Sequence, residues 1–215
     1  MEIPNYDSTD YSNKKYKQLF PFMPSDTFWM LICGNSGCGK TNLLFHMLIK
    51  PLLLYYDEIY LYARNLHQDK YQKLIQKMND LSSKTGYDIL HVSDDEIIPI
   101  KELGYEDNQK LVIFDDYVCD KNQKKLIDYF IQGRHKNCSV IYLCQSFFKT
   151  PFEIRKGCTH YCLYQPLSKG DTSRISSELG INKEDLKSAT RKPYSFLYFD
   201  KPKKYIAKNF NGNII

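Results

Sequence analysis

A glycine-rich turn near the amino end of the chain has the residue types that suit a phosphate group. The octapeptide GNSGCGKT spans Gly34 to Thr41 and matches the pattern G-x-x-x-x-G-K-[ST] at every fixed position. Glycines let the backbone curl so that successive N–H groups point inward, and a helix that begins near Lys40 adds its positive amino end. The candidate nucleotide-binding residues are therefore Gly34, Asn35, Ser36, Gly37, Cys38, Gly39, Lys40, Thr41 and Asn42.

The last two residues of this turn have distinct chemical roles. Lys40 is long enough to reach the β- and γ-phosphates of a nucleoside triphosphate, and the Thr41 hydroxyl is an oxygen ligand that Mg²⁺ accepts. The sequence therefore predicts that the turn binds ATP together with Mg²⁺.

Acidic and amide side chains follow two later apolar runs. LVIFDD ends in Asp115 and Asp116, and CSVIYLCQS carries Gln145 near its end. The first acid suits a magnesium contact, and the second suits a base that positions and deprotonates water. Gln145 ends the strand that we expect beside that of the two acids, where it can hydrogen-bond the γ-phosphate or the attacking water. These residues favour hydrolysis of the bound nucleotide.

Two arginines are candidates for completing such a site. Arg134 leaves the helix expected between the strands of Asp115 and Gln145, and we expect it near the edge of the sheet that binds the nucleotide. An arginine placed there can reach a phosphate held by a neighbouring subunit. Arg155, in PFEIRKG, is the alternative, and the sequence does not choose between them.

The tetrapeptide NKED imitates a motif for guanine recognition. It spans Asn182 to Asp185 and matches the pattern N-K-x-D of GTPases, but it follows the polar, helical stretch SSELG instead of a buried strand. The chain also contains no D-x-x-G, which a GTPase needs to sense the γ-phosphate. We therefore interpret Asn182 as the N-cap of a helix with an acid at the third position.

A group of cysteine and histidine residues raises the question of a metal. Cys158, His160 and Cys162 alternate, so we expect all three to face one side of a strand. A zinc site needs further ligands, which only His135 and Cys138 could offer. The interpretation that we favour is a buried strand face.

An alternation of strands and helices must position these residues. Apolar runs at 27–33, 58–63, 88–92, 111–115, 139–144 and 159–164 are the expected strands. Helical patterns occupy 40–49, 69–81, 121–132, 151–156 and 172–179, followed by INKEDLKSA, and Gly133 is expected to cap the third helix. This order predicts an α/β fold with a mostly parallel sheet covered by helices. YSFLYFD and KKYIAKN predict a final β-hairpin that turns at Lys201–Pro202.

Length and composition suit one α/β domain. Of the 215 residues, we expect 1–18 to form a polar arm and 19–215 to form the domain. The net charge of +5 permits a nucleic-acid partner without requiring one. Most of the seven cysteines lie in apolar runs, which favours reduced thiols in an intracellular compartment. We expect a soluble protein with no membrane partner, because no signal peptide or apolar span of about 18 residues is evident.

The motifs occur in an order that resembles viral genome-packaging ATPases. The similar segments are FMPSDTFWMLICGNSGCGKTNLL, YDEIYLYARNLHQDKYQKL, KLVIFDDYV, IQGRHKNCSVIYLCQSFFKTPFEIRKG and DTSRISSELG. They are similar to the poxvirus-type branch of the FtsK–HerA superfamily, which virophages and giant DNA viruses share. The resemblance covers roughly residues 20 to 200.

The resemblance implies a RecA-like P-loop NTPase that forms a homo-oligomeric ring, a pentamer or hexamer, and pumps double-stranded DNA into a preformed capsid. It implies a capsid or portal-vertex protein as partner, and the cytoplasmic viral factory of an infected host cell, or the virion, as location. By position, Lys40 and Thr41 would bind ATP and Mg²⁺, and Asp115 would hold the metal. Asp116 would take the place of the catalytic acid, and Gln145 that of the sensor.

Two other functions remain open at this point. A nucleoside or nucleotide kinase also has a P-loop on a parallel sheet, but it needs an arginine-rich lid and an acceptor pocket. An ATP-binding assembly subunit that does not hydrolyse ATP is the third interpretation. For a motor, the candidate DNA contacts are the basic stretches 64–77 and 121–125, which the sequence does not distinguish from ordinary solvated helix faces.

Overall fold

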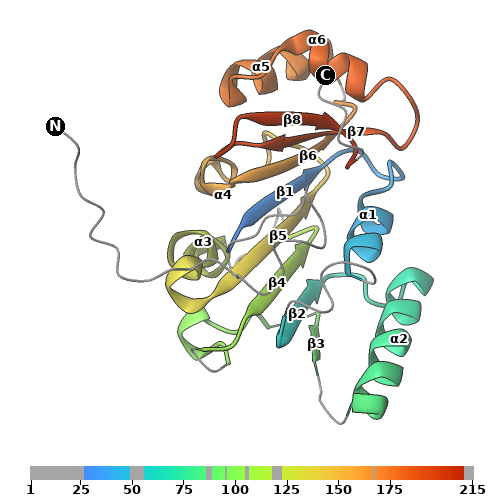
Figure 1. Ribbon diagram of the computed structural model, residues 1–215, viewed down its shortest axis with the longest axis vertical. Coiled ribbons are helices and arrows are strands. Elements are labelled where there is room, and N and C mark those ends of the chain that lie inside the picture. The colour runs from blue at the N-terminus through green and yellow to red at the C-terminus, as the bar shows by residue number, and fades with distance from the viewer. Residues whose placement is uncertain are drawn as a thin grey trace, which may run out of the picture.

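Eight strands form one twisted sheet in the computed structural model of the chain (Figure 1). The structure describes residues 27–48, 56–85, 89–94, 96–104, 107–117, 123–166 and 168–210. The arm expected at 1–18 and the basic residue Lys121 lie outside these ranges. The strands are β1 (Trp29–Cys33), β2 (Glu58–Ala63), β3 (Leu90–Ser93), β4 (Lys110–Asp115), β5 (Cys138–Cys144), β6 (His160–Tyr164), β7 (Phe196–Asp200) and β8 (Tyr205–Lys208).

The strand order within this sheet is β3-β2-β4-β5-β1-β6-β7-β8. All pairings among the first six strands of that order are parallel. The strands β7 and β8 pair antiparallel, which confirms the predicted hairpin. β5 lies between β1 and β4, so the strand that precedes the glycine-rich turn and the strand that carries the two acids are not neighbours. The mostly parallel α/β architecture is thus the predicted one.

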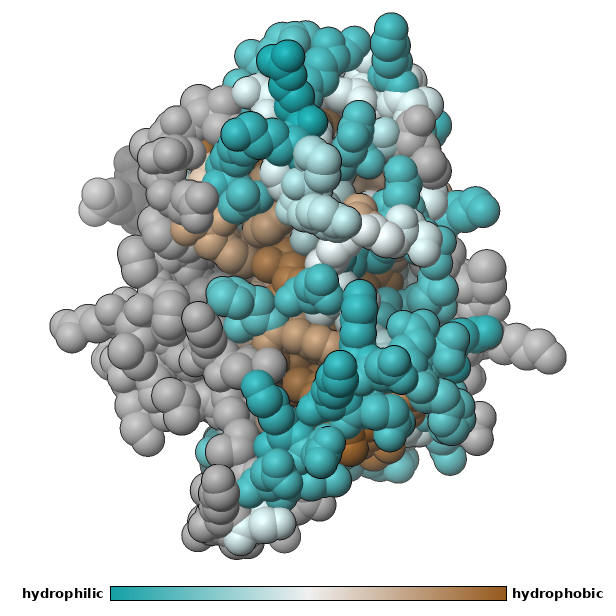
Figure 2. All heavy atoms as spheres, turned by 90° about the vertical axis from the view of Figure 1, so that its right-hand side faces the viewer, coloured by the Kyte–Doolittle hydropathy of each residue, from teal (hydrophilic) through white to brown (hydrophobic). Residues whose placement is uncertain are grey.

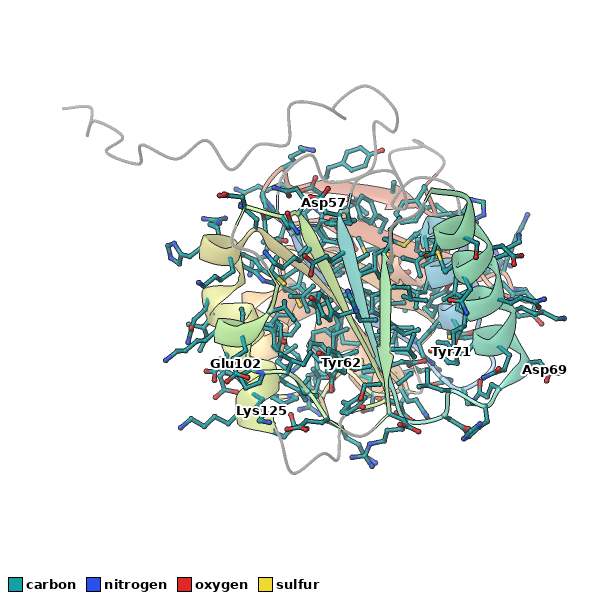
Figure 3. All side chains as sticks on the ribbon, turned by 90° about the horizontal axis from the view of Figure 1, so that it is seen from below. Asp57, Tyr62, Asp69, Tyr71, Glu102 and Lys125 are labelled. Atoms are coloured by element: carbon teal, nitrogen blue, oxygen red, sulfur yellow. The ribbon has the colours of Figure 1, made fainter. Side chains whose placement is uncertain are left out.

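Helices cover both faces of the sheet. They are α1 (Lys40–Met47), α2 (Asp69–Thr85), α3 (Gln123–Gln132), α4 (Phe152–Gly157), α5 (Lys169–Leu179) and α6 (Lys183–Ala189), with 3₁₀ turns η2 (Ile100–Glu102) and η3 (Gly133–Lys136). Apolar residues of α1 and α2 pack in one core, and those of the later four helices pack in a second core. Seen from below the view of Figure 1, the sheet separates α2 from α3 (Figure 3).

The central strands are apolar on both faces because each face is covered by helices. Every residue of β1 is buried, and the side chains alternate between the two cores. Met30 and Ile32 pack with α1 and α2, whereas Leu31 and Cys33 pack on the opposite face. This pattern explains why the strand shows a continuous apolar run and no alternation with polar residues.

The expectation that Gly133 caps the third helix was wrong. Gly133 does not have a positive φ; it begins η3, and the left-handed residue after that turn is Asn137, with φ 49°. A Cβ at Gly133 would lie 3.0 Å from the carbonyl oxygen of Cys138 and 3.1 Å from Nε1 of Trp29. Close packing therefore explains this glycine, and the glycine that does end a helix in the left-handed conformation is Gly180.

The cysteines and histidine near β6 do not share one face, contrary to expectation. Cys158 precedes the strand and packs in the core of α3 and α4, whereas Cys162 packs in the core of α1 and α2. His160 hydrogen-bonds the Thr159 hydroxyl at 2.7 Å and lies 3.7 Å from an Asp200 carboxylate oxygen. Among the described residues, no group of three or more His, Cys, Asp or Glu side chains is arranged to hold a metal ion.

The NKED segment begins a helix. Asn182 is the N-cap of α6, and its Oδ1 accepts a hydrogen bond of 2.8 Å from the Glu184 backbone N–H. NKED is thus a helix start, as predicted.

Within the ranges that the structure describes, no helix has the length and apolar character needed to cross a membrane.

The turn between β7 and β8 depends on Asp200. Its carboxylate accepts a hydrogen bond of 3.1 Å from the Lys203 backbone N–H and lies 3.2 Å from the Lys203 ammonium. Burial opposes the charge, but the His160 imidazole, the Lys203 N–H and the Lys203 charge outweigh it and lower the pKa of Asp200 to about 2. The ionised carboxylate thus stabilises the hairpin and its contact with β6.

Asp200→Asn should lower the melting temperature by a pH-dependent amount. Because the folded-state pKa lies below the ordinary value of 3.8, the stabilisation is fully present above that value and is lost as pH falls towards about 2. The difference in melting temperature between wild type and variant, measured by circular dichroism, should therefore narrow between about pH 5 and about pH 2. Asp80→Asn, at an exposed position of α2, is the control, and its melting temperature should equal that of wild type throughout this pH range. A difference in melting temperature between wild type and Asp200→Asn that does not change with pH would contradict the role of the Asp200 charge.

Candidate nucleotide-binding site

The glycine-rich turn joins the carboxyl end of β1 to α1. Its first residue is tied to the neighbouring strand, because the Gly34 N–H donates to the Cys144 carbonyl oxygen at 3.1 Å. Gly37 and Gly39 have φ values of 77° and 107°, which residues with a Cβ rarely adopt. A Cβ at Gly34 would lie 2.5 Å from Tyr164 Cβ and 2.7 Å from Cys38 Sγ, so the backbone there requires glycine.

The Lys40 side chain folds back into this turn. Its ammonium donates to the carbonyl oxygens of Gly34 at 2.6 Å and Asn35 at 2.9 Å, and the side chain is buried. Ser36 and Gly37 are exposed at the tip of the turn, and Asn42 is exposed in the first turn of α1. The turn is thus accessible at its tip, and it holds a positive charge beside its backbone, a combination that suits an anion such as phosphate.

Tyr71 joins the turn to the first of the two acids. The Tyr71 hydroxyl donates a short hydrogen bond to the Asp115 carboxylate, and it also hydrogen-bonds the Thr41 side chain. Burial raises the pKa of Asp115; the Tyr71 hydrogen bond and the Lys40 charge oppose this rise, and the Asp116 charge adds to it. The structure therefore brings Thr41 and Asp115 together, as the predicted magnesium site requires.

Asp116 and Gln145 meet one residue beyond the ends of β4 and β5. Gln145 Nε2 donates to Asp116 Oδ2 at 3.1 Å, and both side chains are exposed. Asp116 has a φ of 62°, a left-handed conformation that costs a residue with a Cβ about 1–3 kcal/mol. Its backbone N–H donates to Leu143 at 3.3 Å, which holds this turn against β5. The backbone is thus bent at the position that we predicted to act on water.

A cleft runs from the glycine-rich turn to Gln145. Its lining comes from the carboxyl ends of β1 and β6, the segments that follow β1, β5 and β6, and α5. These residues are Cys33, Gly34, Asn35, Gln145, Ser146, Phe147, Phe148, Leu163, Tyr164, Gln165, Pro166, Asp171 and Ile175. Gly34 and Gln145, which are far apart in sequence, therefore border the same cleft. This edge of the sheet is where parallel α/β folds bind their ligands.

Arg134 does not lie near this edge, contrary to expectation. The helix α3 runs back across the sheet, so η3 and Arg134 precede β5 at the amino ends of the parallel strands. Its guanidinium lies 5.5 Å from the ring centroid of Trp29, the first residue of β1. About 16 Å of strand, at about 3.3 Å per residue, separates that position from Gly34. The Arg134 side chain is exposed.

Arg155 is held by contacts within the same chain. On α4, its guanidinium forms an ion pair with Glu178 of α5 and donates from Nε to the Thr150 carbonyl oxygen at 3.1 Å. The guanidinium also lies 5.2 Å and 5.3 Å from the ring centroids of Phe147 and Phe148. These contacts place Arg155 behind the aromatic wall of the cleft.

The arrangement fits a magnesium nucleotide better than a metal held by the protein alone. Mg²⁺ prefers oxygen ligands and is commonly bound by one or two protein groups together with phosphates. The Thr41 hydroxyl and the Asp115 carboxylate, joined by Tyr71, are two such groups beside the turn. These two residues could therefore hold the cation of a bound nucleotide.

Sequence reasoning missed Tyr71. It occupies an apolar position of α2, in line with Leu74 and Met78, and all three side chains are buried in one core. Such a position is indistinguishable from that of any core tyrosine, because its partners lie 30 and 44 residues away in the sequence (71 − 41 and 115 − 71). The hydrogen-bond partners of its hydroxyl, known only from the structure, identify it.

The chain matches a family of viral proteins. The model of the poxvirus A32 protein family covers residues 15–191. The chain belongs to the poxvirus A32 protein family. This result confirms the resemblance that the order of the motifs indicated.

Curated relatives within this group are DNA packaging proteins of orthopoxviruses. DNA packaging protein OPG160 of Variola virus is 32% identical over 145 residues, which are 64% of this chain and 53% of that protein. The same protein of Vaccinia virus strain Copenhagen matches with the same identity and coverage. The chain therefore spans about half the length of the curated relatives it matches.

Solved structures share the fold. The genome packaging NTPase B204 from Sulfolobus turreted icosahedral virus 2, in complex with AMPPCP, matches 85% of this chain and 96% of its own, with a TM-score of 0.64 and 16% identity. B204 from Sulfolobus turreted icosahedral virus, described as a DNA-packaging ATPase, matches 84% and 96% with a TM-score of 0.63 and 19% identity. The predicted P-loop NTPase fold is confirmed.

Gly34→Ala should weaken nucleotide binding. The added methyl group must displace Tyr164 or the turn itself, and such overpacking costs about 1–3 kcal/mol. If this cost falls on the bound state, it corresponds to a loss of affinity of roughly 5- to 150-fold. Titration of a fluorescent ATP analogue measures this loss. Gly170→Ala in α5 is the matched control, because its nearest neighbour would lie at an ordinary 3.6 Å. Equal affinity of both variants would contradict the assignment of this turn.

Proposed function

We propose that this chain is the ATPase of a motor that moves double-stranded DNA into a preformed capsid. The observation that carries the proposal is the meeting of Lys40, Thr41, Asp115 and the Asp116–Gln145 pair at one edge of the sheet. Membership of the poxvirus A32 family supports it, since the curated relatives are DNA packaging proteins. A loop for phosphate, a pair of cation ligands and a carboxylate for water are the parts that ATP hydrolysis needs.

Each residue of the site has a separate task in this proposal. Lys40 and the backbone N–H groups of the turn bind the phosphates, and Thr41 and Asp115 orient the cation. Bound Mg²⁺ neutralises charge that develops on the phosphates. Asp116 accepts the proton of the attacking water, and Gln145, which donates to Asp116 Oδ2, holds that carboxylate in place.

A homo-oligomeric ring, pentameric or hexameric, would let one subunit complete the site of the next. The two candidate arginines differ in how free they are for this role. Arg155 would have to leave Glu178 and the aromatic rings around it. Arg134 is exposed, and its guanidinium rests on the face of the Trp29 ring. These contacts favour Arg134 as the residue that reaches the phosphate of a neighbour.

The proposed motor acts with other components of a virus. Its partners are double-stranded DNA and a capsid or portal-vertex protein, and its place is the cytoplasmic viral factory of an infected host cell or the virion. This part of the proposal rests on the DNA packaging proteins among the relatives of the chain.

The basic face of α2 is the better candidate for contact with DNA. Lys70, Lys73 and Lys77 are exposed and line one groove, and the described contacts contain no hydrogen bond or ion pair of their ammonium groups. Figure 2 views the side of the molecule that carries α1 and α2, and hydrophilic side chains gather over its lower part, where α2 lies. In the rival basic stretch, Lys125 is engaged with Glu96 at 3.8 Å and with the Ile97 carbonyl oxygen at 3.2 Å.

ATPase activity tests the proposed function directly. Wild-type protein should release phosphate from ATP, and double-stranded DNA at low salt should stimulate the release. Lys40→Ala should lose binding and activity, whereas Asp116→Asn should bind ATP normally and turn over on the order of 100-fold more slowly, because it lacks the proton acceptor.

Three results would point elsewhere. A wild-type rate that DNA does not change would contradict a DNA motor. Transfer of phosphate to a nucleoside instead of water would indicate a kinase. Tight ATP binding with no phosphate release by wild-type protein in the presence of DNA would indicate an assembly subunit that does not hydrolyse ATP.

Replacing Lys70, Lys73 and Lys77 by glutamine should weaken DNA binding and reduce its salt dependence. Each lost phosphate contact lowers the slope of log K against log salt by about 0.9, so the triple variant should lose up to about 3. Fluorescence anisotropy with duplex DNA over a salt series measures both the affinity for DNA and the slope. Glutamine at Lys169, Lys192 and Lys204, three exposed lysines on other elements, is the charge-matched control. Equal slopes for the two triple variants would exclude α2 as the contact.

A further inference from the structure

The hydroxyl of Tyr71 lies between two elements that carry the proposed cation ligands. It donates to Asp115, at the end of β4, and it hydrogen-bonds Thr41, in the first turn of α1. Tyr71 itself belongs to α2, whose inner side faces the sheet in Figure 3, where Asp69 of the same helix points away. Three elements of the fold therefore meet at one hydroxyl group.

Burial alone does not explain this arrangement. The Tyr71 ring packs edge-on against Phe45, with 5.6 Å between centroids, and a phenylalanine would make the same contact. Tyr129 and Tyr161 satisfy their hydroxyls with backbone carbonyl oxygens, of Ile98 at 2.5 Å and of Cys158 at 2.9 Å. Buried Tyr60 donates to a side chain, the Glu58 carboxylate, but Glu58 is not part of the candidate site. Tyr71 instead binds two side chains, and both belong to the candidate site.

We propose that Tyr71 is a positioning residue for the divalent cation and that it ties α2 to the state of the nucleotide site. The proposal rests on the proposed function, since it takes Thr41 and Asp115 as the protein ligands. The hydroxyl keeps the Asp115 carboxylate and the Thr41 hydroxyl turned towards one point. Groups of this kind, which orient a ligand without touching the metal, commonly change metal affinity by about 10- to 100-fold.

The position of Tyr71 on α2 gives this contact a second consequence. Lys70 and Lys73 are its neighbours on the helix, and they are exposed on the opposite side from the buried ring. The three residues lie within about 4.5 Å along the axis of one helix, at about 1.5 Å per residue, so a movement of α2 that follows the Tyr71 hydroxyl would carry these ammonium groups with it. Tyr71 thus links the cation to the surface proposed to contact DNA.

Tyr71→Phe separates this role from ordinary packing. The full-length protein is titrated with a non-hydrolysable fluorescent ATP analogue, first in EDTA and then over a series of Mg²⁺ concentrations, and Mn²⁺ binding is followed by electron paramagnetic resonance. We expect unchanged affinity for the analogue in EDTA, and a rise of roughly 10-fold or more in the cation concentration needed for half-maximal effect.

Tyr129→Phe is the matched control. It removes a buried hydroxyl from the opposite face of the sheet, and it should lower the melting temperature without changing the cation dependence. An unchanged cation requirement in Tyr71→Phe would overturn the proposal, and so would a lower one, because the hydroxyl would then compete with the cation. If Mg²⁺ does not change the affinity of wild-type protein for the analogue, the assignment of Thr41 and Asp115 as cation ligands is wrong, and the role of Tyr71 with it. If Mg²⁺ does change that affinity, but Tyr71→Phe needs the same cation concentration as wild type, only the role of Tyr71 is wrong.

Discussion

The parallel pairing of β5 between β1 and β4 determines where every catalytic candidate lies. Parallel strands end at the same edge of a sheet, so the turn after β1, the acids after β4 and Gln145 after β5 meet there. Two hydrogen bonds of 3.1 Å fasten these strand ends to one another, from Gly34 to Cys144 and from Gln145 to Asp116. A strand order without β5 in the middle would separate the carboxylate from the glutamine that holds it.

The same constraint removes one arginine from the site and leaves the other engaged. A helix that connects two parallel strands must return to the opposite edge, which places Arg134 beside Trp29 at the amino ends. Arg155 remains near the cleft, but Glu178 neutralises its charge. Within one chain, neither guanidinium is placed to contact a phosphate in the candidate nucleotide site. This geometry is consistent with the proposed ring, in which each subunit would receive an arginine from its neighbour.

α2 is the element that could relate chemistry to movement. Its buried side carries Tyr71, which is hydrogen-bonded to both proposed cation ligands. Its exposed side carries lysines for which the described contacts include no hydrogen bond or ion pair. The helix itself forms no part of the glycine-rich turn, and its sequence shows only an amphipathic pattern. Its role follows from the two partners that the fold gives Tyr71, namely Asp115 at the end of β4 and Thr41 in α1.

Local sequence determined the parts of this protein that depend on near neighbours in the chain. The glycine-rich turn, the acids at a strand end, the N-cap Asn182 and the final hairpin follow from turn chemistry and from periods of two or 3.6 residues, which are properties of short segments. The tertiary structure alone decided the strand order, and with it the edge at which Arg134 lies. It also decided the ion pair of Arg155, the partners of Tyr71, and the packing that requires Gly133. Each of these depends on residues that are distant in sequence, and no local pattern records which of them become neighbours.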